Sequence, residues 1–310
     1  MLFRQLEYFV AVARERHFAR AAEACYVSQP ALSASIAKLE RELNVTLINR
    51  GHNYEGLTSE GERLVVWAKR ILAEQEAFKA EVTAVQSGIT ATLRLGTEPT
   101  ASTTLALPVA AFCAAHPLAK VQVQSRSTTT ELHRQLREFE LDAAIAHFAP
   151  DDRESLQLVP LYEEKYMVLA SGDQLTPHTH TMTWKEAAEL PLAMLTHDMR
   201  IRHVIDKAFT EAGVVVTPQM ETDSVASLYA LVGLGAWASI VPHTWLRAMP
   251  VIGRTRVARL VEPDTRAQIS VATHAASPGS VAARAFVTAA KGLSLNEFFH
   301  QSLPTEHRFQ

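Results

Sequence analysis

The residues Phe18-Ala19-Arg20-Ala21-Ala22 and, after a short gap, Val27-Ser28-Gln29-Pro30-Ala31-Leu32-Ser33 decide how the start of this 310-residue chain folds. Apolar side chains before and within this stretch recur at positions i, i+3, i+4 and i+7, which places them on one face of a helix. They form two sets: Leu6, Phe9, Val10 and Ala13; then Phe18, Ala21, Ala22 and Cys25. Only residues 14–17 separate the two sets. The pattern therefore predicts two short helices joined by a tight turn.

A third helix is predicted to begin after Ser28, because serine is a good N-cap and Pro30 is tolerated in a first helical turn. Its inner stripe consists of Leu32, Ile36, Leu39 and Leu43. The opposite face carries small and polar side chains together with two cations. A helix that enters the major groove needs short side chains, hydrogen-bonding groups near its N-terminus for bases, and cations for phosphates. Taken alone, however, the same face also fits an ordinary solvated helix.

The ordered run of residues resembles the helix-turn-helix of LysR-type transcriptional regulators. The likeness continues without a gap through Leu39-Glu40, Asn49-Arg50 and Leu57-Thr58-Ser59-Glu60-Gly61, which resemble the family's wing and the start of its linker helix. By this resemblance one set of side chains faces bases and another meets phosphates. The first is Gln29, Pro30, Ser33, Ala34 and Ser35; the second is Lys38, Arg50 and His52.

Three residues depart from the family pattern. Asn44 stands where glycine is usual, Ile48 where phenylalanine is usual, and Ala34 where a longer polar residue is common. Asparagine tolerates a positive φ, so we expect the turn at residue 44 to survive. Ile48 keeps an apolar side chain under the wing. Ala34 removes a base contact, so the sequence preference of relatives does not transfer to this chain.

A long helix is predicted from Ser59 to about Ser87, with Ser59 and Glu62 in capping-box spacing. At 1.5 Å per residue it would be roughly 43 Å long. Its apolar positions alternate by four and three residues, the pattern of a coiled-coil seam, with one glutamine that could set the register between two chains. The seam is Leu64, Ala68, Ile71, Gln75, Phe78, Val82 and Val85. A buried helix of a monomer is the alternative, and the strict spacing favours dimerisation.

The bulk composition indicates a water-soluble chain and does not by itself indicate a nucleic-acid-binding protein. The net charge is −3, and residues 1–58 hold seven Lys or Arg against six Asp or Glu, so DNA affinity must come from where charges lie. The sequence shows neither a signal peptide nor a membrane-spanning run, and we expect a cytoplasmic protein without a membrane partner. Cys25 and Cys113 form no CxxC pair, so buried, reduced thiols are expected.

From residue 89 the pattern changes to short apolar strands that alternate with amphipathic helices, which predicts a largely parallel α/β sheet. Two such series, with crossovers near Leu161 and Arg266, resemble the two-lobed, periplasmic-binding-protein-like sensing domain of LysR-type regulators. We therefore expect three segments: a winged helix-turn-helix over 1–58, a linker helix over 59–88 and an effector-binding domain over 89–310. Lobe I would span about 89–161 and 269–292, and lobe II about 162–268.

Three loops rich in hydroxyl groups or cations follow predicted strands, at residues 96–104, 125–130 and 196–202. Strand ends and helix N-termini favour anions, although each loop could equally be a simple helix cap. The resemblance implies an effector pocket lined from these loops, with His147 at its floor. The expected effector-binding residues are Thr100, Ser102, Thr128, Thr129, His147, Thr196 and Arg200. They point to a small organic acid or anion, beside which the carboxylate of Glu98 is awkward.

Two other classes of protein fit the sequence less well. An enzyme would need a nucleophile with a base, a metal cluster or a cofactor motif. The only close histidine pair is His178 and His180, which lacks a carboxylate or cysteine at ligand spacing, so no catalytic residue, metal or cofactor is expected. A solute-binding protein would fit residues 89–310 but not the first ninety. The expected partners are promoter DNA and further copies of the chain, as a homodimer and, by resemblance, a homotetramer; RNA polymerase could be another.

Overall fold

The computed structural model of the chain describes residues 1–50, 54–176, 178–249, 254–275 and 279–300. By contacts within the chain it divides into two compact units, residues 1–88 and residues 89–310. Each unit has its own hydrophobic core. No helix among the described residues is long and apolar enough to span a bilayer.

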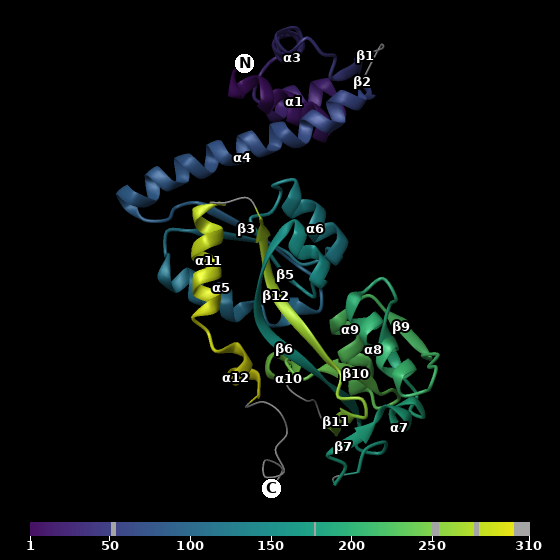
Figure 1. Ribbon diagram of the computed structural model, residues 1–310. Helices are drawn as coiled ribbons and strands as arrows, with labels where there is room; N and C mark the ends of the chain where they lie inside the picture. Colours follow the sequence, from purple (N-terminus) through teal and green to yellow (C-terminus); the bar gives the residue numbers. More distant parts are fainter. Residues whose placement is uncertain (51–53, 177, 250–253, 276–278, 301–310) are drawn as a thin grey trace. The chain divides into compact units, whose positions relative to one another are not determined.

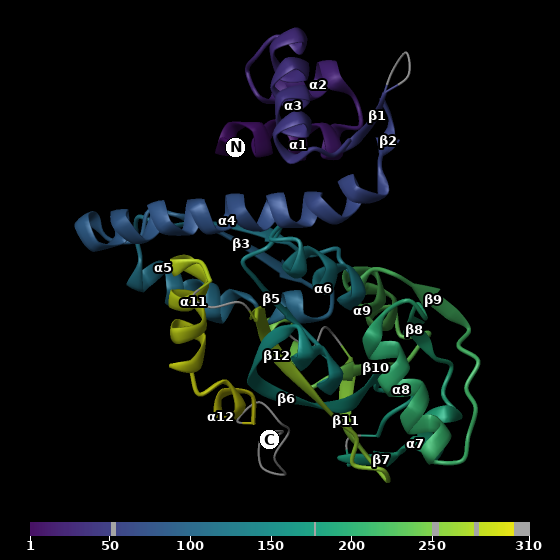
Figure 2. The same ribbon diagram turned by 45° about the horizontal axis from the view of Figure 1, so that its top comes forward.

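The first unit is a three-helix bundle with a two-stranded wing and one long helix (Figures 1 and 2). Its elements are α1 (Phe3–Glu15), α2 (Phe18–Ala24), α3 (Gln29–Leu43), β1 (Ile48–Arg50), β2 (Tyr54–Leu57) and α4 (Ser59–Ser87). The predicted inner stripe is confirmed, since Leu32, Ile36 and Leu39 are fully buried. Asn44 ends α3 with φ +51°, as expected for a residue that tolerates a left-handed turn.

Helix α4 begins at Ser59, as predicted, but a different residue caps it. Thr58 is the N-cap: its hydroxyl oxygen accepts a hydrogen bond from the Gly61 backbone N–H at 2.9 Å. The same hydroxyl donates to the carbonyl of Thr46 at 2.7 Å. Ser59 is already helical and donates to Glu60, so the predicted capping box of Ser59 and Glu62 is wrong. Thr58 is the favoured cap because its hydroxyl also donates to the carbonyl of Thr46, in the segment before the wing.

The second unit contains an eight-stranded sheet with the order β4-β3-β5-β12-β6-β11-β7, and β10 pairs with β6. Helices α5 and α11 lie side by side in both views, and their residues Phe112 and Phe286 are in edge contact at 5.9 Å (Figures 1 and 2). The elements before the long strand β6 are β3 (Thr92–Thr97), η1 (Ala101–Thr103), α5 (Ala106–Ala115), β4 (Lys120–Gln124), α6 (Thr129–Arg137), β5 (Ala143–Ala146) and η2 (Pro150–Glu154). Those from β6 onward are β6 (Leu156–Ser171), β7 (Thr181–Thr183), α7 (Trp184–Ala188), β8 (Ala193–Leu195), α8 (Arg200–Glu211), β9 (Met220–Thr222), α9 (Val225–Gly233), β10 (Ser239–Pro242), α10 (Trp245–Ala248), β11 (Thr255–Val261), β12 (Arg266–His274), α11 (Val281–Lys291) and α12 (Leu295–His300).

The sheet is not largely parallel, so that prediction is wrong. Strand β3 pairs in parallel with β4 and β5, but β6 pairs antiparallel with β12, β11 and β10. The 16-residue β6 runs from one hydrophobic core into the other: Leu161 belongs to the first, and residues 166–170 belong to the second. Its second half is buried on both faces, so it lacks the polar–apolar alternation that reveals a strand in sequence.

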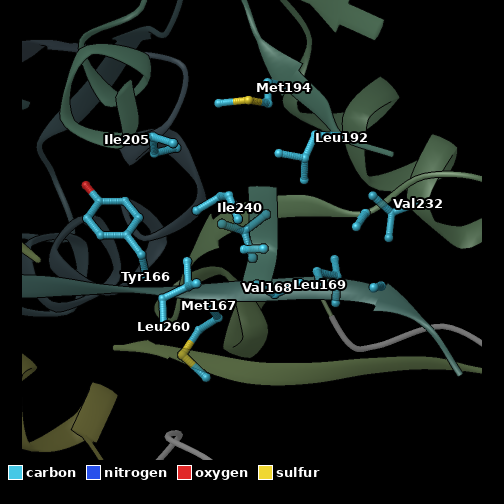
Figure 3. Close-up of a cluster of buried hydrophobic side chains, with 14 of the residues drawn as sticks. Tyr166, Met167, Val168, Leu169, Leu192, Met194, Ile205, Val232, Ile240 and Leu260 are labelled. Carbon is cyan, nitrogen blue, oxygen red and sulfur yellow. The ribbon is translucent and has the colours of Figure 1, made fainter. Parts of the chain in front are cut away.

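The two cores of the second unit define what we call lobe I and lobe II. Lobe I is built on β3, β4, β5, α5 and α11, and lobe II on β8, β10, α7, α8 and α9. Figure 3 shows the core of lobe II, where side chains of β6 and β10 lie next to Ile205 of α8 and Val232 of α9. Helix α12 follows α11 near the end of the described chain. Its Phe299 packs on Tyr162 of β6 at 4.9 Å.

Candidate DNA interface and effector site

The outward face of α3 carries the predicted base-facing residues. Gln29, Pro30 and Ala34 are exposed, while Ser33 and Ser35 are half-buried. Lys38 is 60% exposed and its ammonium nitrogen lies 3.9 Å from a carboxylate oxygen of Glu42, one turn further along. Because such an exposed ion pair is weak, Lys38 remains available to a phosphate. Six of the eight predicted DNA-binding residues therefore lie on α3. The other two, Arg50 and His52, follow it in the chain.

The wing follows α3 directly. Strands β1 and β2 pair antiparallel, with Ile48 opposite Leu57 and Arg50 opposite Tyr54. Arg50 ends β1, but its side chain is not described, and His52 lies outside the described residues. The carboxylate of Glu40 on α3 accepts hydrogen bonds from the backbone N–H groups of Leu47 and Ile48, at 2.9 and 3.2 Å. Glu40 therefore ties the wing to the recognition helix, a positioning role that sequence reasoning missed.

A shallow groove runs beside the outward face of α3. It is lined by Ala34, Ala37, Glu40, Arg41, Asn44, Val45 and Thr46. The small side chains of the two alanines leave the helix backbone accessible, and Arg41 is exposed at the edge. This shape suits the close approach that a major-groove helix needs.

The predicted coiled-coil seam of α4 divides into two parts. Leu64, Ala68 and Ile71 pack against the core of the same unit, and Ala68 is only 2% exposed. Phe78, Val82 and Val85, in the C-terminal half, are exposed apolar side chains. Gln75 lies between the two parts. The seam residues of the C-terminal half thus form an apolar face that the chain's own first unit does not cover.

In the second unit, a buried cluster joins three strands. Glu98 follows β3, His147 follows β5 and Glu164 lies within β6, and each is at most 4% exposed. The His147 ring nitrogen Nδ1 is hydrogen-bonded to Glu98, and Nε2 lies 3.0 Å from Glu164 Oε2. The His147 backbone N–H also donates to Glu98 at 3.2 Å. We call these three residues the acid–imidazole cluster.

The charges in this cluster follow from its geometry. Burial alone would lower the pKa of His147, but the negative charge of Glu98 and hydrogen bonds to both carboxylates raise it to about 10. Burial would likewise raise the pKa of Glu98, yet the imidazolium holds that pKa below its usual value. His147 is therefore a cation with both N–H groups engaged by carboxylates, and it has no donor left for an effector. The predicted role of His147 at a pocket floor is replaced by a structural one.

Hydroxyl groups from both lobes close the cluster. Thr129 of α6 donates to Glu98 at 3.2 Å, and the Thr100 hydroxyl is also hydrogen-bonded to Glu98. From lobe II, Thr244 donates to Glu164 at 3.1 Å. The indole N–H of Trp245, a residue of the lobe II core, donates to the carbonyl of Thr100 at 3.0 Å. The cluster is thus where the two lobes are hydrogen-bonded to each other.

Two further residues of the predicted effector set form local hydrogen bonds. Ser102 donates to the carbonyl of Pro99 at 2.5 Å, and Thr128 caps α6 by accepting from the Glu131 backbone N–H at 3.2 Å. The simple capping interpretation therefore accounts for Thr128. Ser102 and Thr129 thus use their O–H groups within lobe I, whereas Thr128 uses only its oxygen, as an acceptor.

The lobe II loop after β8 holds the remaining predicted residues. Arg200 is exposed at the start of α8. The hydroxyl oxygen of Thr196 is buried and has no hydrogen-bond partner in the described part of the chain. The loop is anchored by Arg202, which is 1% exposed and was not predicted. Its guanidinium donates to the Leu195 carbonyl at 2.7 Å and to Glu221 at 2.6 Å.

Other chemistries find little support in the arrangement. Within the described ranges, no three His, Cys, Asp or Glu residues are arranged to hold a metal ion. Cys113 is exposed on α5, and Cys25 is half-buried after α2, where burial raises the pKa of its thiol. The expectation that both thiols are buried is therefore wrong for Cys113.

Two families match the chain. Residues 3–62 match the family described as "Bacterial regulatory helix-turn-helix protein, lysR family", and residues 86–293 match the "LysR substrate binding domain". The chain is 32% identical over 247 residues to the SDS degradation transcriptional activation protein of Pseudomonas sp., covering 77% of this chain and 78% of that protein. It is 31% identical over 255 residues to a hydrogen peroxide-inducible genes activator of Haemophilus influenzae, covering 78% of this chain and 80% of that protein.

Solved structures show the same fold. A full-length OxyR variant from Pseudomonas aeruginosa superposes with a TM-score of 0.76 at 24% identity, covering 99% of each chain. CbnR in complex with its target DNA superposes with a TM-score of 0.64 at 24% identity, covering 94% of this chain and 99% of CbnR.

Proposed function

The chain belongs to the LysR family and is a DNA-binding transcriptional regulator with an effector-binding domain, not an enzyme; from this premise we propose which residues perform each task. Residues 1–58 bind the operator, residues 59–88 join two chains, and residues 89–310 bind a small-molecule effector. The polar, small-residue face of α3 is the observation that carries the proposal, because Gln29 and Ser33 project from a helix whose opposite stripe is buried.

At the DNA, Gln29, Ser33 and Ser35 face base edges, and Pro30 and Ala34 permit close approach. Lys38, with Arg50 and His52 by family resemblance, meets phosphates. A wild-type operator is first selected from a random duplex library. The double variant Gln29→Ala/Ser33→Ala should then lose specific binding in a gel-shift assay, whereas Thr83→Ala, far along α4, should bind normally. Normal binding by the double variant would refute the assignment of α3.

Lys38→Ala provides a second test of the same face. A phosphate contact carries no sequence information, so its loss should weaken binding to every duplex about equally. It should also reduce the slope of the logarithm of the binding constant against the logarithm of the salt concentration by about 1. A change of sequence preference instead would mean that Lys38 reads a base.

Oligomerisation is proposed to use the C-terminal half of α4. LysR-family structures include full-length chains of the same fold, and we propose a homodimer that pairs into a homotetramer. Phe78, Val82 and Val85 supply the apolar surface, since these side chains are exposed in the single chain. Phe78→Glu should reduce the mass measured by light scattering, and the wild type should show a tetramer. Glu81→Gln, on the same helix, serves as the control.

The effector is proposed to act at the junction of the lobes, beside the acid–imidazole cluster. Its binding would change how the lobes meet, and through the dimer would change the spacing of the winged units on the promoter. Such a ligand shifts the equilibrium only by its differential affinity for the two assemblies. Footprints of identical length and hypersensitivity with and without an effector would refute this mechanism. We further infer that the protein works in the cytoplasm, where promoter DNA and RNA polymerase are found.

A further inference from the structure

The hydroxyl group of Tyr166 on β6 is the most conspicuous polar group that the family assignment leaves without a role. The side chain is 1% exposed, and its oxygen has no hydrogen-bond partner in the described part of the chain. Figure 3 shows the ring rising from β6 on the side of Ile205, with the hydroxyl at the far end. Buried polar groups in native proteins nearly always have a partner, so this hydroxyl marks a place where one is supplied from outside.

The surroundings of that hydroxyl are negatively charged. Glu164 lies two residues earlier on the same strand, and strand alternation puts both side chains on one face of β6. Burial raises the pKa of Tyr166 well above its usual value, and the charges of Glu164 and Glu98 raise it further. The phenol is therefore a protonated donor. An anion placed against it would be repelled by the same two carboxylates.

The cluster itself cannot compensate an anion. It holds two carboxylates against one imidazolium, and both N–H groups of His147 are engaged by those carboxylates. The hydroxyl groups of Thr100 and Thr129 are directed at Glu98 as well. A carboxylate effector in contact with the cluster would lose its hydration without gaining a charged donor from the cluster, which is unfavourable in a buried site.

Lobe II offers a second unpartnered hydroxyl. The Thr196 oxygen is buried without a hydrogen-bond partner among the described residues, at the end of β8. Its neighbours in sequence, Leu195 and Ile201, belong to the same hydrophobic core as Tyr166. A threonine hydroxyl both donates and accepts, whereas the tyrosine hydroxyl, in its negative surroundings, chiefly donates.

Resting on the proposed function above, we propose that the effector is a small uncharged molecule that accepts a hydrogen bond from the Tyr166 hydroxyl, with the Thr196 hydroxyl as its second contact in lobe II. The sequence pointed instead to an organic acid or anion. The carboxylates of Glu98 and Glu164 repel an anionic effector but not an uncharged one, and this distinguishes the two classes of effector.

The first experiment compares two buried tyrosines of β6 in the full-length protein without any ligand. Tyr162→Phe removes a hydroxyl that is hydrogen-bonded to Thr104, so its melting temperature should fall. Tyr166→Phe removes a hydroxyl without a partner, so its melting temperature should stay equal to the wild type or rise. A fall of equal size in both variants would overturn the proposal, because it would give Tyr166 an internal partner. Thr104→Val replaces Tyr162→Phe as the control if that variant does not fold.

The second experiment uses matched probes that differ in charge: lactamide and lactate, benzamide and benzoate, glycerol and glycerate. In thermal-shift titrations of the full-length protein, uncharged members should raise the melting temperature at lower concentration than their carboxylates. Tyr166→Phe and Thr196→Val should each raise the half-saturating concentration of an uncharged probe about five- to tenfold. Tyr162→Phe should leave that concentration unchanged.

Tighter binding of the carboxylates, or no shift with any uncharged member, overturns the inference about the effector. A gel shift of the wild type on its selected operator then separates the two claims. Retained DNA binding leaves the regulator intact and removes only the effector class, whereas absent specific DNA binding refutes the proposed function itself.

Discussion

The recognition helix α3 and the acid–imidazole cluster place polar side chains in opposite ways. On α3, Gln29 and Lys38 point into solvent and rely on a partner outside the chain, because the inner stripe occupies the other face. In the cluster, His147 and its two carboxylates satisfy one another and exclude water. The contrast shows that residue type alone does not reveal a binding group. What matters is whether its hydrogen-bonding capacity is already used within the fold.

Replacing His147 should produce the largest effect and would break the cluster. His147→Gln removes the only cation between two buried carboxylates, and leaving buried charges uncompensated typically costs about 3–5 kcal/mol. Urea unfolding of the full-length protein measures this loss. His197→Gln is the matched control, because His197 also contacts a carboxylate but is 65% exposed, so its change should be much smaller. Equal losses would mean that the cluster is open to water.

Gly61→Ala should have the next largest effect, and it tests the region next to α3. A Cβ at residue 61 would lie 2.0 Å from the backbone carbonyl oxygen of Leu47, which cannot move without shifting the wing. We expect a loss of about 3 kcal/mol, at the upper end for overpacking, together with weaker operator binding. Gly96→Ala is the control in the second unit, since there the Cβ would meet only the side-chain ends of Leu132 and Leu141. A normal wing in Gly61→Ala would contradict this account.

The pH dependence of stability should come next in size. The pKa of His147 is about 10 in the folded protein and about 6.5 when unfolded. A raised folded pKa gives stability that is complete below about pH 6.5 and is lost as pH rises toward 10. The free energy of unfolding should therefore fall by up to about 1.4 kcal/mol per pH unit between pH 7 and 9. His147→Gln should lack this slope; an unchanged slope would assign it to other groups.

Replacing the cysteines should have the smallest effect. Relatives include hydrogen peroxide-inducible genes activators, and a thiol response in this chain would have to use Cys25 or Cys113. Neither lies near the acid–imidazole cluster in sequence or in the hydrogen-bond network described for it. We expect Cys25→Ser/Cys113→Ser to bind the operator like the wild type, with no change on adding hydrogen peroxide to either protein. A peroxide-dependent footprint that the double variant loses would reveal a thiol switch.

The helical part of the molecule was the part that the sequence predicted well. The stripe of Leu32, Ile36 and Leu39, the Ser28 cap and the left-handed Asn44 all depend on residues within a few positions of one another. The one-residue shift of the α4 cap arose because Thr58 has a partner, Thr46, on the other side of the wing.

The effector site was predictable only as a set of loops. Glu98 and His147 are 49 positions apart, and His147 and Glu164 are 17 apart. The residues next to them in sequence do not indicate that the three side chains are in contact. The carboxylate of Glu98, which is awkward beside an anion, is the one signal of this cluster in the sequence. Tyr166 gave none, because an aromatic residue in an apolar run is indistinguishable from an ordinary core residue.

Local periodicity and capping thus predicted three short helices and one long helix, since those interactions reach no further than a few residues, and the resemblance to LysR-type regulators added the wing and the DNA-binding role. The tertiary structure alone decided which polar groups remain unsatisfied. Strand β6 passes from one lobe to the other and brings Glu164 to His147 while leaving the Tyr166 hydroxyl without a partner. Hydrogen-bond satisfaction depends on every neighbour in space, and neighbours in space are set by the topology of the sheet.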